Sequence, residues 1–407
     1  MEVLMIGNGF DLSCNLPTTY LCFLWSVSCI VNFVTKHGGL GLISYLPEIS
    51  IYDVLSNIQG ICPEAKNSLD AYEEVYKKVI IQKESIWKFA KICEENCWWH
   101  YFYHKGFMNI NWIDFEQEIK TVLDVFEDFF EKNKEEKPEK YYYDTLLDDV
   151  SKQYLCYFDF FYDVDSKTGI RICKKYIKRH PIDSTKIIID REQIITELYK
   201  DLGGFISIMR EYFKVFVDET LDEIKASGNF RCNEEFAKVD MVISFNYTNA
   251  MEKLYDISNV AHIHGKIDGD IVLGVDPDEK DEKDGDTTFI PFKKYYQRVV
   301  KKTDLDYLER IQSIMKQDYP AYSTRLRIFG HSLDKTDGDI IEELFGVANE
   351  ITVYYHKEED EPKFLRNLVR ILGKEKLDEI RLNKKLEFKN ISELKVREEK
   401  SRVSIQF

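Results

Sequence analysis

Paired cysteines, a secretory leader and a long apolar run are all missing from this sequence. The nine cysteines are odd in number and none forms a C-x-x-C pair, so we expect reduced thiols. The apolar segment Leu21–Val34 is interrupted by serine and cysteine and is too short to span a membrane. The opening MEVLMIGNGFDL lacks the basic flank of a signal peptide. These absences predict a cytoplasmic protein that does not associate with a membrane.

Basic charge is also scarce relative to acidic charge. The chain of 407 residues has 56 basic and 72 acidic side chains, which gives a formal charge of −16. A molecule with this charge repels phosphate backbones and anionic membranes, which argues against nucleic acid as a partner. Hydrophobic residues make up 44% and aromatic residues 14% of the chain, which excludes a disordered protein. A chain of this length usually forms about two domains.

The first residues predict one buried strand, and the long middle of the chain predicts helices. Glu2–Ile6 is a short apolar run closed by a glycine turn. From about residue 19 to residue 236, apolar side chains recur mostly at three- and four-residue spacing, which indicates amphipathic helices. The clearest of these helical segments are Ala71–Ile81, Ser85–Phe102, Phe115–Phe130 and Glu192–Ile224.

Strand patterns return after residue 236. Strands separated by helical or loop stretches predict a parallel sheet covered by helices. The lone N-terminal strand has no partner nearby in the sequence, so we expect it to join this sheet. Residues 1–20 and 237–407 then form one α/β domain, and residues 21–236 form a large, mainly helical insertion. The strands expected after residue 236 are Asp240–Ser244, Val260–Ile263, Ile271–Val275, Arg325–Phe329 and Ile351–Tyr355.

Two polar stretches predict solvated connections. They are Lys132–Lys140 and Asp276–Asp286, and both are rich in charged residues. The second follows a predicted strand end, where ligands of open α/β sheets bind. A role as a lid or as a cation site is therefore left open for that acidic stretch.

The first motif that carries chemistry is the turn after the N-terminal strand. Gly7, Asn8, Gly9, Phe10 and Asp11 lie between a predicted strand and a helix-compatible segment. Glycine lets the backbone approach a phosphate closely, and the following amides can point at the anion. The third glycine of the dinucleotide-binding fingerprint is absent. A plain turn between a strand and a helix is the alternative interpretation.

The second motif is SFNYTN, which directly follows a predicted strand. Ser244, Asn246 and Tyr247 stand at the carboxyl end of that strand, where this architecture places its ligand. The Asn246 amide can hold a ribose hydroxyl through either its oxygen or its nitrogen. The alternative is that the asparagines only form a turn or cap a helix.

The third motif is HIHG on the next predicted strand. His262 and His264 would face the same side of a strand, and Gly265 would allow a ligand or a backbone segment to come close to His264. An imidazole is well suited to moving a proton near neutral pH. A packed core histidine and a metal-binding pair are the alternatives.

The fourth motif is GHSLD, again after an apolar strand. Gly330 ends the strand, and Ser332 and Asp334 bring a hydroxyl and a carboxylate. Four strand ends thus offer polar turns that tolerate close backbone approach, all to one edge of the predicted sheet. This coincidence favours a shared ligand site over four separate structural turns.

With these motifs in view, the chain resembles the AbiH family of bacterial abortive-infection proteins. The resemblance is carried, in order and spacing, by IGNGFDLSCNLPTTY, SFNYTNAMEKLY, HIHGK and FGHSLDKTD. The middle of the chain resembles the family mainly in character, with one weaker match at Trp112–Glu116. An ordinary first helical turn capped by Asn111 is the alternative interpretation of that segment.

The same motifs are similar, more distantly, to the NAD-binding core of sirtuins and sirtuin-like NAD hydrolases. This similarity implies a Rossmann-like fold in which Gly7 and Gly9 match a G-A-G motif and Asn246 a T-x-N motif. His264 would match the histidine of an H-G motif. Asn8 replaces the usual alanine, and Asp11 stands where serine is expected. The positions that would match the sirtuin G-x-S-L motif are Gly330, Ser332 and Leu333.

Metal binding is not expected. The paired cysteines of the sirtuin zinc module are missing, which argues against protein deacylation. Cys93, Cys97, His100 and His104 lie along one face of a predicted helix. Four ligands on one continuous helix cannot surround a tetrahedral ion, although two could supply half a site. We therefore interpret them as a buried apolar or aromatic stripe.

The leading hypothesis is a phage-defence effector that binds NAD or a related nucleotide and cleaves its nicotinamide–ribose bond. Asn246 would position the ribose and water, and His264 would accept a proton. The turn at Gly7–Gly9 would hold the phosphates, Ser332 would hold a ribose or phosphate oxygen, and Asp11 with Asp334 would oppose the pyridinium charge.

Two alternatives remain. One is a non-catalytic nucleotide sensor whose helical insertion recognises a phage or host protein. The other is a metal-dependent nuclease or phosphoesterase that uses His262, His264 and nearby aspartates. Whether the chain forms a homo-oligomer is left open by the sequence.

Overall fold

A computed structural model describes most of the chain. The described residues are 1–38, 83–108, 115–133, 137–138, 149–165, 169–228, 230, 232–275, 287–303, 305, 307–310, 323–394 and 396–397. The helix expected at Ala71–Ile81 and the acidic stretch at 276–286 lie outside these residues. The same holds for part of the stretch at 132–140 and for residues 112–114, whereas Phe115 and Glu116 are described.

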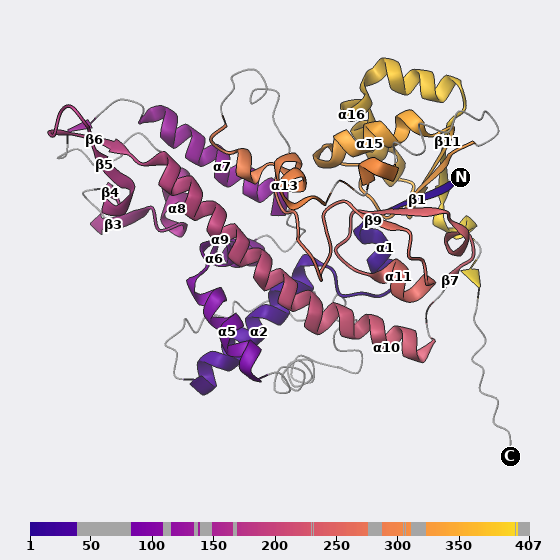
Figure 1. Cartoon of the computed structure of the whole chain (residues 1–407), viewed down its shortest axis with the longest axis horizontal. Helices are drawn as coiled ribbons and strands as arrows, with labels where there is room; N and C mark the ends of the chain where they lie inside the picture. The colour runs from indigo at the N-terminus through magenta and orange to yellow at the C-terminus, as the bar shows by residue number, and fades with distance from the viewer. Residues whose placement is uncertain are drawn as a thin grey trace.

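The centre of the described structure is one parallel sheet of six strands (Figure 1). Its first strand, β1 (Glu2–Ile6), lies between strands from the second half of the chain, as expected. Val3 pairs with Met241 on one side and with Leu326 on the other. The other strands are β8 (Met241–Ser244), β9 (Val260–His262), β10 (Arg325–Phe329), β11 (Glu350–Tyr355) and β12 (Leu386–Asn390).

The strand order gives the sheet a defined ligand edge. From one edge to the other the order is β9-β8-β1-β10-β11-β12. Counted along the chain as strands one to six, this is the 3-2-1-4-5-6 order of the Rossmann-like folds. The order reverses between β1 and β10, and ligands of such sheets bind outside the carboxyl ends of the strands at that point. The turns after β1 and β10 therefore occupy the expected ligand position.

Both faces of the sheet are buried. In β1, Val3 and Met5 belong to one hydrophobic cluster, whereas Leu4 and Ile6 belong to another. The cluster of Val3 and Met5 includes side chains of α15 (Gly338–Val347) and α16 (Asp360–Leu382), which lie together in Figure 1. Such double burial is typical of parallel strands covered by helices.

The other cluster joins the sheet to the helical middle of the chain. It contains Leu4 and Ile6 of the sheet together with Phe102 and Tyr212 of the helices. The long helix α9 (Arg191–Tyr212) continues through the π-helical segment η3 (Phe213–Asp218) into α10 (Glu219–Ser227), and it runs from the helical part to below the sheet (Figure 1). The division into two domains at residues 20 and 237 stays a prediction. The other helices of this part are α2 (Tyr20–Gly38), α5 (Lys83–Glu95), α6 (Cys97–Met108), α7 (Phe115–Lys132) and α8 (Asp149–Tyr157).

The helix expected at Ser85–Phe102 is interrupted. Asn96 separates α5 from α6, and its side-chain oxygen accepts a hydrogen bond from the Trp99 amide at 2.8 Å. The bond caps the new helix start. Cys93 and Cys97 therefore lie on two helices, and the prediction that these residues share one face of a single helix was wrong.

Strand assignments also differ in places. Ile271–Val275 was expected to be a strand, but it makes only isolated bridges, from Ile271 to Gly265 and from Val275 to Lys293. β12 was not predicted, because its polar sequence Leu386–Asn390 lacks an apolar run. The helical middle also contains short strands that were not predicted. They are β2 (Lys137–Pro138), β3 (Phe161–Asp165), β4 (Gly169–Ile172), β5 (Ile177–Arg179), β6 (Lys186–Ile189) and β7 (Cys232–Asn233), which pairs with β13 (Val396–Arg397).

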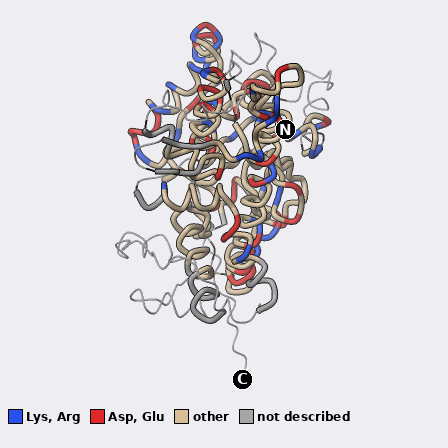
Figure 2. Tube along the Cα trace, turned by 90° about the vertical axis from the view of Figure 1, so that its left-hand side faces the viewer, with Lys and Arg blue, Asp and Glu red and all other residues tan. Residues whose placement is uncertain are grey.

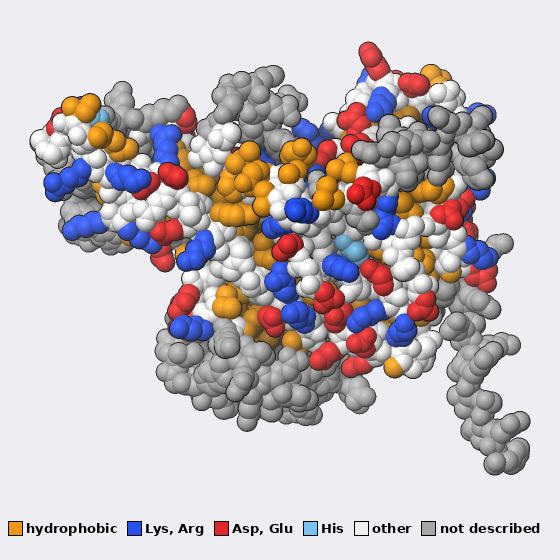
Figure 3. Space-filling model, viewed as in Figure 1, with side chains coloured by type: hydrophobic (Ala, Val, Ile, Leu, Met, Phe, Trp, Pro, Cys, Tyr) orange, Lys and Arg blue, Asp and Glu red, His pale blue; other side chains and the backbone are white. Residues whose placement is uncertain are grey.

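The described surface is mixed in charge and carries local apolar areas. Acidic and basic residues are interspersed along the trace in Figure 2. In Figure 3 apolar side chains gather over the region of α13 (Lys294–Lys301), where Tyr295, Val299 and Val300 are exposed. None of the described helices is long and apolar enough to cross a membrane. A cytoplasmic location stays a prediction.

Candidate functional site

The turns after β1 and β10 are in direct backbone contact. The Gly7 amide donates to Phe329 O at 3.2 Å, and the Gly9 amide donates to Gly330 O at 2.8 Å. The Phe10 amide donates to Gly7 O at 2.8 Å, and its ring packs in the core against Phe329. These three amides of the predicted phosphate turn therefore already have carbonyl acceptors.

Glycine is required here because the two turns approach so closely. A Cβ on Gly9 would lie 2.6 Å from Gly330 Cα, and a Cβ on Gly330 would lie 2.3 Å from Phe10 N. Gly330 also has a φ of 70°, in the region that favours glycine. Between the glycines, Asn8 donates through its side chain to Thr18 O at 3.3 Å. The structure thus gives the glycine pair a packing role, and their phosphate role stays a prediction.

Gly9→Ala is expected to destabilise the fold by roughly 1–3 kcal/mol, because the new methyl group overlaps backbone that cannot rotate away. Gly203→Ala is the matched control, since Gly203 lies in α9 with nothing within 4 Å of the added Cβ. Alanine there should leave stability unchanged or raise it by about 0.5–1 kcal/mol. Urea unfolding of both variants measures the difference. If Gly9→Ala and Gly203→Ala unfold at the same urea concentration, the turns after β1 and β10 can separate at little cost in free energy.

The turn after β8 is tied to the turn after β1. The Asn246 side chain is buried and donates to Gly7 O at 2.9 Å. The Asn246 backbone N–H donates to Ser244 Oγ at 3.2 Å, and the Tyr247 hydroxyl donates to Val272 O at 3.0 Å. Asn246 therefore stands at the predicted edge, while Ser244 and Tyr247 stabilise the loops beside it.

Asp11 lies in α1 (Asn8–Ser13) and is almost completely buried beside this turn. The Thr248 hydroxyl lies 2.9 Å from both Asp11 carboxylate oxygens and donates to either of them. Burial raises the pKa of Asp11 to about 7, although hydrogen bonds from Thr248 and Asn246 oppose the rise. Asp11 therefore changes charge near neutral pH.

Asp11→Asn should change how stability depends on pH. The folded protein binds the Asp11 proton more tightly than the unfolded chain, so this contribution is complete below about pH 4 and is lost as pH rises through 7. The asparagine variant does not lose this contribution. Its free energy of unfolding, relative to that of the wild type, should therefore rise by on the order of 3 kcal/mol between pH 4 and pH 8. Denaturant unfolding across that range tests this. Parallel stability curves for the two proteins would show that Asp11 is not protonated in the fold.

The two histidines of HIHG have separate partners. β9 ends at His262, whose Nε2 lies 2.8 Å from Glu252 Oε1 and whose Nδ1 lies 3.1 Å from Asn246 O. His264 lies in the following turn, where its Nε2 is 3.0 Å from Asp337 Oδ1, without the alignment of a hydrogen bond. The prediction that both histidines face one side of a strand was wrong, because the strand ends before His264.

Gly265 allows the turn at His264. It has a φ of 76°, and a Cβ there would lie 1.7 Å from Asp270 O. The group that lies close to Gly265 in this structure is therefore the backbone of Asp270.

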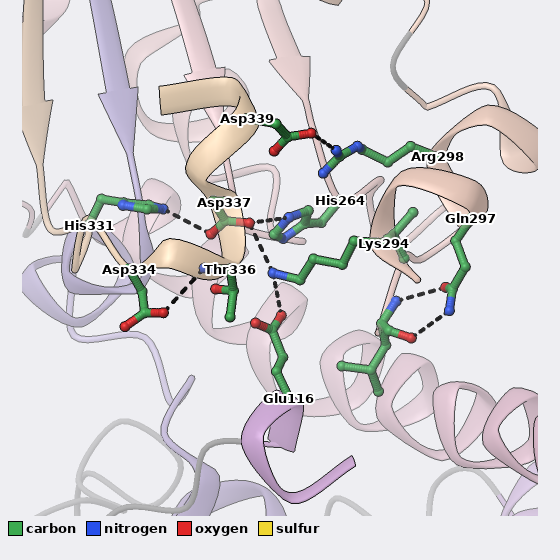
Figure 4. A network of polar contacts seen from close by, with 12 residues as sticks. Glu116, His264, Lys294, Gln297, Arg298, His331, Asp334, Thr336, Asp337 and Asp339 are labelled. Atoms are coloured by element: carbon green, nitrogen blue, oxygen red, sulfur yellow. Dashed lines mark hydrogen bonds and ion pairs between the residues drawn. The ribbon is translucent and has the colours of Figure 1, made fainter. Parts of the chain in front are cut away.

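Asp337 is the centre of the charged network at this edge (Figure 4). Its Oδ1 lies 3.0 Å from His264 Nε2 and 2.9 Å from Lys294 Nζ, and its Oδ2 lies 3.3 Å from His331 Nε2. His331 Nδ1 accepts from the Leu333 amide at 3.0 Å, so the ring proton of a neutral His331 is on Nε2 and faces Asp337. Sequence reasoning did not find Asp337.

Lys294 connects this network to the helical middle of the chain. Its side chain is 1% exposed, and its Nζ lies 2.7 Å from Glu116 Oε1 in the first turn of α7. Gln297 holds α13 in place by bonding both the amide and the carbonyl of Leu273. Sequence reasoning missed Lys294, and Glu116 belonged only to the weak match at Trp112–Glu116.

The network sets the charge of each member. Burial, together with the charge of Lys294, lowers the pKa of His264 to about 4, so its imidazole is neutral at pH 7. Burial alone would raise the pKa of Asp337, but Lys294 and His264 hold it well below its ordinary value. Burial opposes the charge of Lys294, yet Asp337 and Glu116 raise its pKa. The site therefore presents a neutral imidazole beside a compensated carboxylate.

The last two predicted site residues lie outside this network. Asp334 caps the short helix η6 (Lys335–Asp337) by accepting from the Thr336 amide at 3.2 Å. Ser332 is exposed, and its carbonyl accepts from Asn367 at 3.1 Å. Asp334 thus shapes the turn that presents Asp337, and the ligand contacts expected of Ser332 and Asp334 stay predictions.

No three His, Cys, Asp or Glu side chains come together as a metal site among the residues that the structure describes. In the segment considered for half a zinc site, Cys93 is buried and His100 Nε2 lies 2.8 Å from Glu94 O. The expectation that the protein binds no metal stays a prediction.

The strand order and the polar strand ends together define a Rossmann-like α/β protein with a candidate ligand site at its switch point. The chain belongs to the bacteriophage abortive infection AbiH family, whose family model matches residues 3–356. The match includes Val3–Ile6 of β1, the strands β8 to β11, and Asp11, Asn246, His264, Lys294 and Asp337. Membership in this family supports a role in abortive infection of phage-infected cells. No curated protein and no solved structure matched the chain.

Proposed function

We propose that this abortive-infection protein binds NAD or a related nucleotide at the carboxyl edge of β1, β8, β9 and β10 and hydrolyses the bond between nicotinamide and ribose. Loss of the cofactor would halt the infected cell. The observation that carries the proposal is the junction of the turns after β1 and β8, where the Asn246 side chain bonds Gly7 O beside the buried Asp11, in a sheet with Rossmann-like strand order. His264 lies in the turn after the neighbouring strand β9.

In this proposal each residue acts on a defined atom. The bond from nicotinamide nitrogen to ribose C1′ breaks, and its electron pair leaves with neutral nicotinamide. A water oxygen attacks C1′ and its proton passes to His264, whose neutral imidazole has a free electron pair. Asp337, 3.0 Å away, stabilises the imidazolium that results. Asn246 orients the ribose and the water.

The helical middle of the chain is the proposed surface for a phage or host trigger. Glu116 of α7 contacts Lys294, which in turn contacts Asp337 next to His264. A movement of α7 would therefore change the charges around the proposed proton acceptor. This link offers a physical route from a trigger to the site.

The test is to incubate the purified protein with NAD, to follow free nicotinamide, and to measure ligand binding by thermal shift in parallel. Release of nicotinamide with a rise in melting temperature supports the proposal. The experiment is repeated with lysate from infected cells, which supplies the trigger. Binding of NAD without release of nicotinamide under both conditions would favour the nucleotide sensor. Absence of both would remove the nucleotide proposal.

A further inference from the structure

Two buried aspartates lie at this edge of the sheet in opposite surroundings. Asp337 has three nitrogen partners within 3.3 Å, from Lys294, His264 and His331. Asp11 is bonded by the Thr248 hydroxyl, and no lysine, arginine or histidine nitrogen of the described residues lies within 4.0 Å of it. Asp11 is 1% exposed, so bulk solvent does not screen its charge.

A buried carboxylate without a cation is costly, so the group holds a proton instead. This agrees with the pKa of Asp11, which burial raises to about 7. Asp11 is thus poised between a neutral form and a charged form at neutral pH. A positive charge placed within about 4–6 Å would favour the charged form and expel the proton.

The position of Asp11 suits such a ligand charge. It lies directly after the glycine turn of β1, and the Asn246 side chain next to it lowers its pKa. Asn246 is the residue to which we assign the ribose, and in NAD the ribose carries the cationic ring. The cationic ring does not need to touch Asp11, because its charge and the Asp11 carboxylate attract each other through the protein interior.

We propose that Asp11 recognises the positive charge of the ligand ring. A nucleotide with a cationic pyridinium ring binds and releases the Asp11 proton to solvent, whereas the same nucleotide with an uncharged dihydropyridine ring binds more weakly and releases none. This inference rests on the proposed function and makes Asp11 a specificity-determining residue of that site.

Other titratable groups face Asp11 from neighbouring elements. Cys14 lies directly after α1, and burial and Asp11 raise the pKa of its thiol to about 12, so it stays uncharged. His262 of β9 acts on Asp11 through its charge and is bonded to Glu252 of α11 (Ala250–Tyr255). The variants in the following test separate Asp11 from these two groups.

The test is calorimetric titration of the whole protein with the carbocyclic analogue of NAD, which is not cleaved, and with its dihydro form. Titrations in buffers of different ionisation enthalpy give the number of protons released. For the oxidised analogue we expect about 0.4–0.8 proton at pH 6, about half a proton at pH 7 and almost none at pH 9. For the dihydro form we expect none. Above pH 7 the oxidised form should bind about 10–100-fold more tightly.

Three variants assign the proton. Asp11→Asn should abolish proton release and most of the preference for the oxidised form. Thr248→Val removes the hydroxyl that lowers the pKa of Asp11, so proton release should extend to higher pH. Asp268→Asn, at an exposed aspartate bonded to Asn249, should behave as wild type.

The outcomes separate this inference from the proposed function. Equal binding of both forms without proton release, or release that persists in Asp11→Asn, would overturn the role of Asp11 and leave nucleotide binding intact. Binding of neither form would overturn the proposed function and this inference with it. If Asp11→Asn fails to fold, a shift of proton release to higher pH in Thr248→Val still assigns the proton to Asp11, and an unchanged pH dependence in that variant would overturn the assignment.

Discussion

Replacement of His264 by alanine is expected to slow nicotinamide release by about 10²–10⁴-fold, because positioned proton transfer is lost. Asn246→Ala should have an effect of similar size, because the ribose and the attacking water lose their orientation. Binding should change less than rate in both variants. The measurement is single-turnover release of nicotinamide, with the dissociation constant determined separately.

Folding must be controlled in this experiment, because both side chains are buried. Asn246→Ala also removes the bond to Gly7 O, which should cost about 1–3 kcal/mol of stability. Asn249→Ala in the same loop and His180→Ala in the distant β5–β6 hairpin are the matched controls and should keep full activity. Folded Asn246→Ala and His264→Ala proteins with wild-type rates would remove both residues from the mechanism.

Lys294→Met is expected to destabilise the fold by about 3–5 kcal/mol. Lys294 is fully buried between Asp337 and Glu116, so methionine preserves its length but leaves two carboxylates facing each other without a cation. Lys335→Met is the matched control, since Lys335 is exposed in η6 next to Asp337. Denaturant unfolding of both variants measures the difference.

A double-variant cycle checks that the loss comes from the network. If Asp337 is left uncompensated in Lys294→Met, adding Asp337→Asn should recover part of the lost stability. If Lys294→Met is as stable as the control Lys335→Met, the buried network does not contribute to stability as described. Additive losses in the double variant would contradict the coupling between Lys294 and Asp337.

The fold could be predicted because its signals are local. β1 and β10 are short strand-like runs, and each is followed by a glycine. The N-terminal strand has no partner nearby in the sequence, so it was expected to pair with strands from the second half of the chain. The interruption at Asn96 could not be predicted in the same way, because apolar spacing continues across it. Ile271–Val275 has the composition of a strand, but its backbone bonds with Phe292 and Lys294 replace ladder pairing.

The site was predictable only in part. Asn246 and His264 lie two residues after the ends of β8 and β9, and Asp11 lies in the helix that follows β1, so the sequence places all three at the carboxyl edge. Lys294 and Asp337 reach the same point from a helix and a 3-10 turn, and only the folded structure brings them together. The contact of Gly9 with Gly330 is also tertiary, which explains why a turn expected to hold phosphate has its amides bonded to carbonyls.

The most direct test of the central claim is the NAD content of phage-infected cells that carry the wild-type protein or the His264→Ala variant at equal, folded levels. Infected cells also supply the trigger, which a purified protein lacks. Our account predicts that NAD falls after infection with the wild-type protein, and that both NAD loss and phage protection disappear with His264→Ala. Normal NAD loss and normal protection with folded His264→Ala and Asn246→Ala would contradict it.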